Sequence, residues 1–438
     1  MPGMTFRRGV TLTLTVRALT ILVGLVSSIV TARWLGPEGR GLLVTLSVLT
    51  GLALQFGNLG LHSGNIYFVA REPSTTPAVL GNSLWLSLLL GIAGGGAIAA
   101  LGAARPAWFA GLPYALILVS AAALPFQFMI FYFQNTLLGL KDVRAFNAFE
   151  AGLKVVSFAS LAVYLIGFSG GPRGAVVILA IAAAAGGLAS VVYCARRHPF
   201  RPGLDAGLLR RMIPYGGRVY LSCLLSYLVI RVDMLLVNYF LGTDRAGVYS
   251  ITVQIADVLL LLPATIGMIL MPRIAAEARG GRDAGAARRD QGAITARVSR
   301  HAALLMTLVC GATFFLVDPL VGILYGEPFR GAVPATRWLL PGLWALGMNG
   351  ILMNHFAGQG LPRIAVISPL CGVALNLGLN LVLIPAAGIV GAAIASSAAY
   401  AAMFALALAY FVRSGRVGLR ETFVLAPREF FGLLGIGP

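Results

Sequence analysis

Two charged residues lie within a segment of the chain that is otherwise almost entirely apolar. In RVDMLLVNYFLG, residues 231–242, Arg231 and Asp233 interrupt an apolar run that begins at Pro214. Where such a run crosses a membrane, a charge near the midplane costs at least about 2.5–3.5 kcal/mol. Residues placed there normally face protein or water, so both are candidates for binding an ion or an anionic group.

Two polar stripes run along this stretch when it is drawn as a helix. They hold Tyr220, Tyr227, Arg231 and Asn238 on one side and Arg218, Ser222, Ser226 and Asp233 on the other. Arg231 and Asp233 therefore point to nearly opposite sides and do not simply neutralise each other. Two interpretations stay open: each residue binds an ion, or each pairs with a neighbouring helix. Arg218, near the inner end, either joins an anion site or extends to the membrane surface.

Polar stripes also mark other apolar segments. The first segment holds Thr13, Arg17, Thr20, Gly24, Ser27, Ser28 and Thr31, and the second holds Ser47, Gly51, Gln55, Asn58 and His62. Small residues alone would let helices pack closely. Because Arg17, Gln55 and Asn58 are too bulky for that, we expect these two stripes to line a water-filled cavity. A later stripe has smaller members and favours close packing; it consists of Ser368, Gly372, Asn376 and Asn380.

One further carboxylate lies deep in an apolar segment. Asp257 shares a helix face with Ser250 and Gln254 and is a candidate for binding a proton or a sodium ion. Lys154 follows Glu150 by four residues, so a local ion pair is expected there instead.

Motifs for catalysis and for metal binding are missing. The sequence contains no P-loop, no HExxH and no CxxC. Its four histidines are scattered, and its four cysteines lie inside apolar segments without metal-like spacing. We therefore expect neither an enzyme nor a bound metal or cofactor.

The composition indicates an all-α protein that crosses a membrane many times. Of the 438 residues 58% are apolar and 11% are charged, whereas about a quarter are charged in soluble domains. Twelve apolar runs approach the ~20 residues that a helix needs to cross a bilayer. We predict spans at 10–33, 42–61, 79–103, 113–138, 145–168, 174–195, 214–240, 247–271, 300–324, 335–357, 363–384 and 388–412.

The net charge of +18 is distributed unevenly across these spans. In a soluble protein it would suggest nucleic acid, but here 22 of the 33 Lys and Arg lie at one side of the membrane and seven at the other. The remaining four, Arg17, Lys154, Arg218 and Arg231, lie within spans. This asymmetry predicts cytoplasmic N and C termini and no nucleic-acid partner. Heavy use of Ala, Gly and Arg suggests a bacterial genome, and hence the cytoplasmic membrane.

Two short motifs repeat in the same order. RWLGPEGRGLL at 33–43 matches YFLGTDRAGVY at 239–249, and NTLLGLKDVR at 135–144 matches NHFAGQGLPR at 354–363. Each pair joins equivalent spans in a series of six and six. We predict a parallel repeat with an N-terminal lobe at 1–200 and a C-terminal lobe at 201–438. The basic segment 196–212 joins them, and its LDAGLLRRM part is expected along the inner surface.

These motifs resemble a known transporter family. Residues 231–275, with the Asp of RVD, FLG, the AGVYS turn and PRIA, are similar to the seventh and eighth helices of Wzx-type lipid-linked oligosaccharide flippases. WLGPEGRG resembles the first outer loop of the same group, which belongs to the multidrug/oligosaccharidyl-lipid/polysaccharide (MOP) exporter superfamily.

The resemblance implies two six-helix lobes around a central cavity and alternating access. The substrate would be a polyprenyl-pyrophosphate-linked oligosaccharide, carried between leaflets for cell-surface polysaccharide such as O-antigen. Arg17, Arg218 and Arg231 would attract the pyrophosphate, with Gln55 and Asn58 beside it in the cavity. Asp233 and Asp257 are the candidates for coupling to H⁺ or Na⁺.

Other functions remain open. The family also includes drug/cation antiporters, which would favour acidic cavity residues, and a lipid II flippase branch with extra helices. A further alternative is a non-transporting partner of glycan-assembly proteins.

Overall fold

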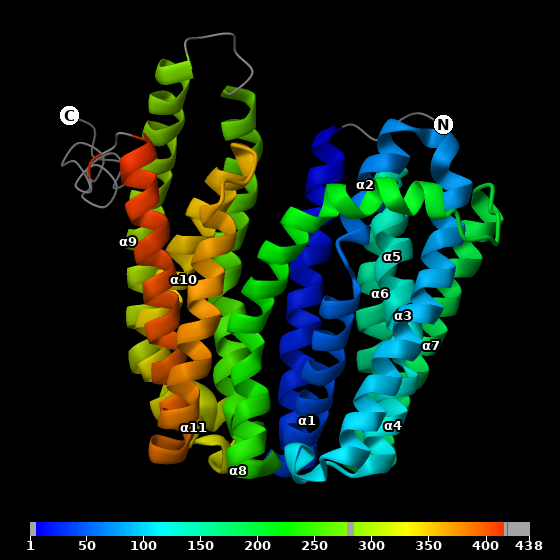
Figure 1. Cartoon of the computed structure of the whole chain (residues 1–438). Helices are drawn as coiled ribbons and strands as arrows, with labels where there is room; N and C mark the ends of the chain where they lie inside the picture. The colour runs from blue at the N-terminus through cyan, green and yellow to red at the C-terminus, as the bar shows by residue number, and fades with distance from the viewer. Residues whose placement is uncertain (1–5, 278–283, 416–417, 419–438) are drawn as a thin grey trace. The chain divides into compact units, whose positions relative to one another are not determined.

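The computed structural model describes residues 6–277, 284–415 and 418, without the side chains of residues 6–14, 218, 284–288 and 415. Every regular element in these ranges is a helix (Figure 1). The long elements are α1 (Phe6–Gly57), α2 (Leu61–Arg71), α3 (Thr76–Ala104), α4 (Tyr114–Ala122), α5 (Leu124–Gly139), α6 (Val143–Ala162), α7 (Pro172–Arg197), α8 (Ala206–Glu277), α9 (Ala284–Leu324), α10 (Ala332–Gly358) and α11 (Ile364–Gly415). Short helical turns lie at Pro73–Thr75, Pro106–Phe109, Val163–Gly167 and Glu327–Phe329.

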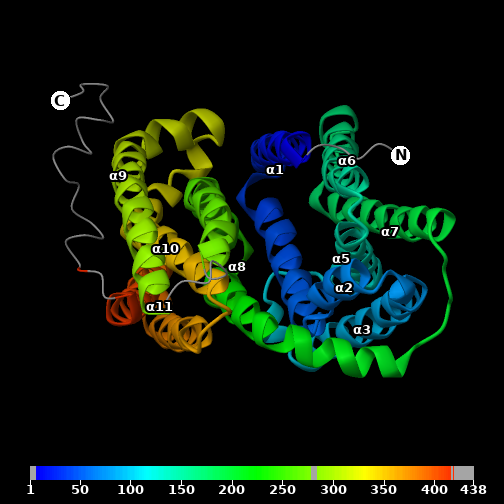
Figure 2. The same cartoon turned by 90° about the horizontal axis from the view of Figure 1, so that it is seen from above.

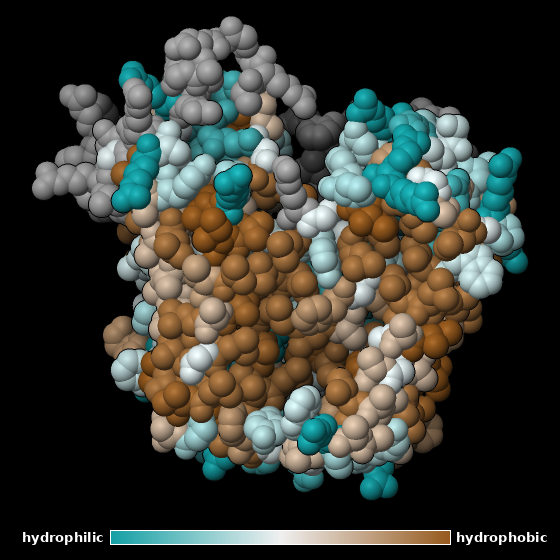
Figure 3. Space-filling model, viewed as in Figure 1, coloured by the Kyte–Doolittle hydropathy of each residue, from teal (hydrophilic) through white to brown (hydrophobic). Residues whose placement is uncertain are grey.

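These helices supply the predicted membrane spans. Eight stretches among the described residues are long and apolar enough to cross a bilayer. Three of them, with 43, 59 and 51 residues, are long enough to cross twice. Counted in this way, the eight stretches supply eleven crossing segments in the described ranges. The remaining predicted span, 335–357, lies in α10, which is not among these stretches. Apolar surface covers the middle of the helices, and hydrophilic residues gather at their ends (Figure 3).

Each of the three long helices turns back at a glycine. Gly36 (φ 65°, ψ −176°) breaks α1, Gly242 (φ 84°, ψ 175°) breaks α8, and Gly388 (φ 61°, ψ −142°) breaks α11. This backbone region is essentially closed to residues with a Cβ. Gly36 and Gly242 hold equivalent positions in the first repeated motif, and their backbones have nearly the same conformation.

The same motif brings two backbones into direct contact. A Cβ on Gly41 would lie 1.8 Å from the carbonyl oxygen of Thr243, and a Cβ on Gly247 would lie 1.8 Å from that of Pro37. The two contacts are reciprocal, because Pro37 and Thr243 each follow the turn glycine of their own repeat. Only glycine allows the segments after the Gly36 and Gly242 turns to approach this closely.

The second repeated motif also has equivalent contacts in its two copies. The Nδ2 atoms of Asn135 and Asn354 each donate to the carbonyl four residues earlier, at 2.7 and 2.9 Å. Gly139 packs on the carbonyl of Asn65, and Gly358 packs on that of Met271. Both copies therefore end a helix against an equivalent neighbour.

The chain divides into two compact units. Unit 1 comprises Met1–Tyr227, Met234–Ser250 and Leu324–Phe329, and unit 2 comprises Leu228–Asp233, Ile251–Ile323 and Arg330–Pro438. The predicted boundary between lobes near residue 200 stays a prediction.

The linker between α7 and α8 packs firmly within unit 1. The Asn82 side chain bonds both the N–H (2.7 Å) and the carbonyl (3.1 Å) of Asp205, whose carboxylate caps α8 at the Leu208 N–H. Arg211 then pairs with Glu72 at 2.8 Å. The first turns of α8 thus run across α2 and α3 (Figures 1 and 2).

Candidate functional site

A charged pair lies deep within the spans of unit 2. The Nη2 atom of Arg231 donates to both oxygens of Asp257, at 3.0 and 2.9 Å. Both residues belong to α8, on opposite sides of the turn at Gly242. The Arg231 side chain is 25% exposed and the Asp257 side chain is 39% exposed, so this ion pair is not fully buried. Another anion or cation can therefore compete for either partner.

Asp233 occupies a different environment in unit 2. It is 2% exposed, and its Oδ2 accepts a hydrogen bond from the Ser396 hydroxyl at 3.1 Å. Ser396 in turn accepts from Asn376 at 3.1 Å, and Asn376 accepts from Asn380 at 2.9 Å. The span-eleven stripe is therefore buried and packed, as its small side chains favoured. Arg231 and Asp233 engage different helical segments, in agreement with their opposite directions on the helix.

The candidates on α1 lie in unit 1, at different degrees of burial. Arg17 is half-buried and has partners within the protein. Gln55 is also half-buried, and its side chain has no hydrogen-bond partner among the described residues. Of these two, Gln55 is the side chain whose amide is available to a ligand.

Asn58 stabilises a turn. The helix ends at Gly57, four residues before the predicted end of span two, and Asn58 is 1% exposed. Its side chain bonds the Nδ1 of His62 at 2.8 Å, while its carbonyl accepts from the Tyr132 hydroxyl at 3.3 Å. Burial lowers the pKa of His62 below its usual value, which keeps the imidazole neutral in this contact.

The backbone of Arg218 lies in α8, but its side chain is outside the described residues. Two tyrosines of the Arg231 stripe are placed clearly. Tyr220 donates to the carbonyl of Phe56 at 2.6 Å, and the Tyr227 hydroxyl lies against Gly51. The N-terminal half of this stripe therefore packs on the second half of α1.

Arg40 is a buried cation that sequence reasoning missed, because it was counted among the outer-loop residues. It is 3% exposed and bonds Ser250 Oγ (2.6 Å), Ser28 Oγ (2.8 Å) and Thr31 Oγ1 (3.0 Å). Its guanidinium also lies 5.8 Å from the centre of the Tyr325 ring. No carboxylate pairs with it in the described part of the chain.

The Arg40 contacts correct one expectation. Ser28 and Thr31, expected to line water, instead bind this guanidinium. Ser28 also bonds the Tyr325 hydroxyl at 3.3 Å, and Arg33 donates to the carbonyl of Leu324 at 2.9 Å. The loop segment Leu324–Phe329 is thereby held on α1. A polar residue four positions after the turn glycine Gly36, facing a stripe of hydroxyls, was the available signal.

Among the described residues, no group of three or more His, Cys, Asp or Glu is placed to hold a metal ion. The chemistry that the geometry offers is anion binding by arginine and cation binding by single carboxylates.

Comparison with known proteins gives the family. The sequence model described as "Polysaccharide biosynthesis protein" matches residues 6–276, more than half of the chain, so the chain belongs to this family. A second model, MatE, matches residues 219–382. The resemblance to MOP exporters is thus confirmed.

Two curated proteins match part of the chain. Uncharacterized membrane protein MJ1068 of Methanocaldococcus jannaschii is 24% identical over 198 residues, which are 45% of this chain and 38% of that protein. The probable low-salt glycan biosynthesis flippase Agl15 of Haloferax volcanii is 23% identical over 195 residues, which are 44% and 40% of the two chains. The chain thus matches less than half the length of each relative.

Solved structures share the fold over nearly the whole chain. Lipid II flippase MurJ in an inward closed conformation has a TM-score of 0.73 at 12% identity, covering 98% of this chain and 95% of that one. An inward-facing multidrug resistance MATE family transporter has a TM-score of 0.70 at 17% identity, covering 91% and 94%. At these identities the likeness shows the fold alone. The chain is a multi-pass membrane protein with the fold of MOP transporters, and its family is one of transporters rather than enzymes.

The Arg40 network should contribute measurably to stability. We expect Arg40→Gln to lower the free energy of unfolding by about 1.5–3 kcal/mol, because hydrogen bonds to a charged group are lost in a buried site. The measurement is thermal unfolding of the purified protein in detergent. Arg33→Gln, an exposed change on the same segment, should cost less than about 1 kcal/mol. Equal small effects of the two variants would show that Arg40 does not hold this segment.

Proposed function

We propose that this protein moves a polyprenyl-pyrophosphate-linked oligosaccharide from the inner to the outer leaflet of the bacterial cytoplasmic membrane by alternating access. The observation that carries the proposal is the environment of Arg231. This cation lies within a predicted span, and the carboxylate that it binds, Asp257, remains partly exposed. The family match and the name of the relative Agl15 support a glycan lipid as the substrate.

The Arg231–Asp257 pair provides a mechanism for binding and release. A pyrophosphate carries more negative charge than one carboxylate and offers more acceptor oxygens, so it can displace Asp257 from the guanidinium. The freed carboxylate is then available to a proton or a sodium ion, so that binding at Arg231 and binding at Asp257 are linked. When the substrate leaves, Asp257 re-forms the ion pair and the cation departs.

Other residues complete the proposed site. Arg17 and Arg218 are proposed as further cations for the headgroup, and Gln55 supplies an amide to a sugar or a phosphate oxygen. Asn58 contributes by fixing the turn after α1. Asp233, in its buried hydrogen-bonded chain, is a second candidate for the coupling cation. Oδ1 of Asn380, in the same chain of hydrogen bonds, is buried and has no partner among the described residues.

A drug/cation antiporter is the second candidate. The MatE match over residues 219–382 covers the two acids of unit 2, Asp233 and Asp257, which a cationic substrate would prefer. Lipid II transport is a third possibility, supported by the fold shared with MurJ.

Substitutions at Arg231 test the proposed function. Arg231→Lys keeps the charge and should retain much of the flux, whereas Arg231→Gln should lower it at least about tenfold, because a neutral amide attracts an anion weakly. Asp257→Asn removes the competing carboxylate, so it should tighten lipid binding and slow turnover. Flux of the lipid-linked glycan is measured in proteoliposomes, and protein abundance in the membrane is measured beside it.

Abundance separates binding from folding in this experiment. A fully buried pair that loses one partner destabilises by about 3–5 kcal/mol, and this partly exposed pair should lose less. A Gln variant that disappears from the membrane would assign Arg231 a structural role. A Gln variant with normal flux would refute the proposal.

The proposed topology places both termini in the cytoplasm. In a variant without native cysteines, Ala107→Cys should react with an impermeant thiol reagent on intact cells, and Gly203→Cys should react only after lysis. Both positions are exposed, and a Cβ at Gly203 meets no atom within 4 Å, so neither change disturbs packing. The reverse labelling pattern would overturn the orientation.

A further inference from the structure

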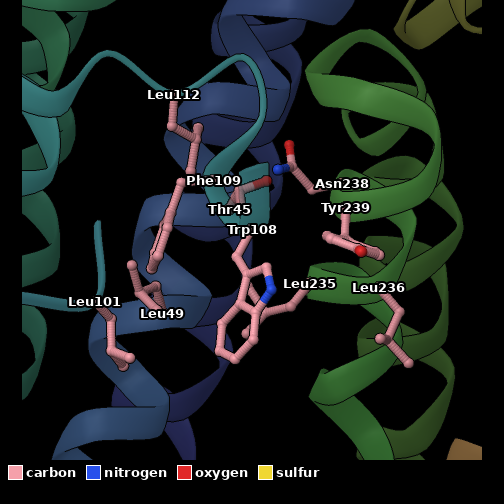
Figure 4. A pocket seen from close by; sticks show the side chains of 10 residues that line it. All are labelled: Thr45, Leu49, Leu101, Trp108, Phe109, Leu112, Leu235, Leu236, Asn238 and Tyr239. Atoms are coloured by element: carbon pink, nitrogen blue, oxygen red, sulfur yellow. The ribbon is translucent and has the colours of Figure 1, made fainter. Parts of the chain in front are cut away.

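An apolar cavity of about 330 Å³ lies inside unit 1, and no charged residue lines it. Its wall comes from the second half of α1, the end of α3, the turn at Pro106–Phe109 and the part of α8 before Gly242 (Figure 4). Apart from two polar residues, the lining is aliphatic and aromatic; it consists of Leu49, Leu101, Trp108, Phe109, Leu112, Leu235, Leu236 and Tyr239.

The cavity is lined in part by membrane-crossing helices. Its helical residues belong to membrane-crossing stretches, and two aromatic residues at its mouth, Trp108 (55% exposed) and Tyr239 (42%), face outward. Trp and Tyr are typical of the boundary between hydrocarbon and headgroups. An apolar cavity of this kind suits a hydrocarbon chain better than water.

Two buried polar atoms at one end of the cavity have no partner among the described residues. They are Oγ1 of Thr45 and Oδ1 of Asn238, on side chains that are 2% and 1% exposed. The Asn238 Nδ2 atom donates to the carbonyl of Ala110 at 3.2 Å, which fixes the amide. Thr45 and Asn238 lie together above the Trp108 indole (Figure 4).

These atoms specify the chemistry of the occupant. Asn238 Oδ1 only accepts, so it needs a hydroxyl or another donor, whereas the Thr45 hydroxyl can donate to a phosphate oxygen. Buried polar groups in proteins are normally hydrogen-bonded, so two at one end of an apolar cavity indicate a ligand with a polar group beside its chain.

We infer that this cavity holds the first isoprene units of the transported lipid, with the phosphate–sugar junction at Thr45 and Asn238. The inference rests on the proposed function, which brings such a lipid to the outer leaflet at this end of the helices. The volume lies at the low end of the ~300–1,000 Å³ range of ligand sites, so it accommodates a segment of a long prenyl chain.

Photolabelling of the full-length protein in bilayers tests the inference. The probe is a farnesyl pyrophosphate with a photoreactive group on its chain, and the labelled peptides are identified by mass spectrometry. We expect labelling at Leu101 and Leu236, with competition by undecaprenyl phosphate but not by equimolar phosphatidylglycerol. Leu236→Trp, which fills the cavity, should reduce labelling at least about tenfold. Ile181→Trp, an equivalent change on the exposed face of α7, should leave it unchanged.

A pair of valine substitutions tests the polar end. Thr45→Val should weaken probe capture several-fold, because it removes the unpartnered hydroxyl. Thr50→Val is the matched control, since the Thr50 hydroxyl already donates to the carbonyl of Leu46 at 3.1 Å.

The outcomes separate this inference from the proposed function. Labelling outside the cavity, or equal competition by phosphatidylglycerol, overturns the inference even if the protein transports the glycan lipid. If the cavity is labelled specifically but the protein moves no glycan lipid, the result supports a prenyl-binding site and refutes the proposed function.

Discussion

The proposed transport depends on the ion pair between Arg231 and Asp257. Hydrocarbon tolerates a charge at this depth only where protein or water neutralises it. The pair meets that condition and still leaves both side chains partly exposed. A sealed pair would serve packing alone, whereas an accessible one can exchange its carboxylate for another anion. This balance between neutralisation and access makes α8 a candidate for binding and transport.

Glycine determines where α8 can place that pair. The turn at Gly242 reverses the chain so that residues 26 positions apart come into hydrogen-bond contact. On the side of unit 1, the reciprocal approach of Gly41 and Gly247 brings α1 against the same turn. Arg40 then satisfies the hydroxyls of the neighbouring stripe and holds the segment before α10. The structure around the Gly36 and Gly242 turns is therefore built from backbone contacts and one buried cation.

Much of the fold could be predicted from the sequence, because hydrophobic runs and turn glycines are local signals. The spans, the helical class and the equivalence of Gly36 with Gly242 all come from such signals. The partners of individual side chains could not be predicted, since they depend on contacts between distant helices. The partnership of Asp257 with Arg231, the turn at Asn58 and the burial of Arg40 are of this kind. Arg40 was misassigned because a residue near a span boundary has the same local hydropathy whether it is exposed or buried.

In the proposed mechanism, the transported group is an anion that arginine binds within the membrane. Transport by the purified protein in liposomes tests it directly, using two lipids with the same glycan and prenyl chain. One is linked through pyrophosphate and the other through a neutral ether. We expect the pyrophosphate lipid to cross with protein-dependent kinetics, and the neutral lipid to cross at the rate of protein-free liposomes. Equal transport of the two lipids would contradict the account.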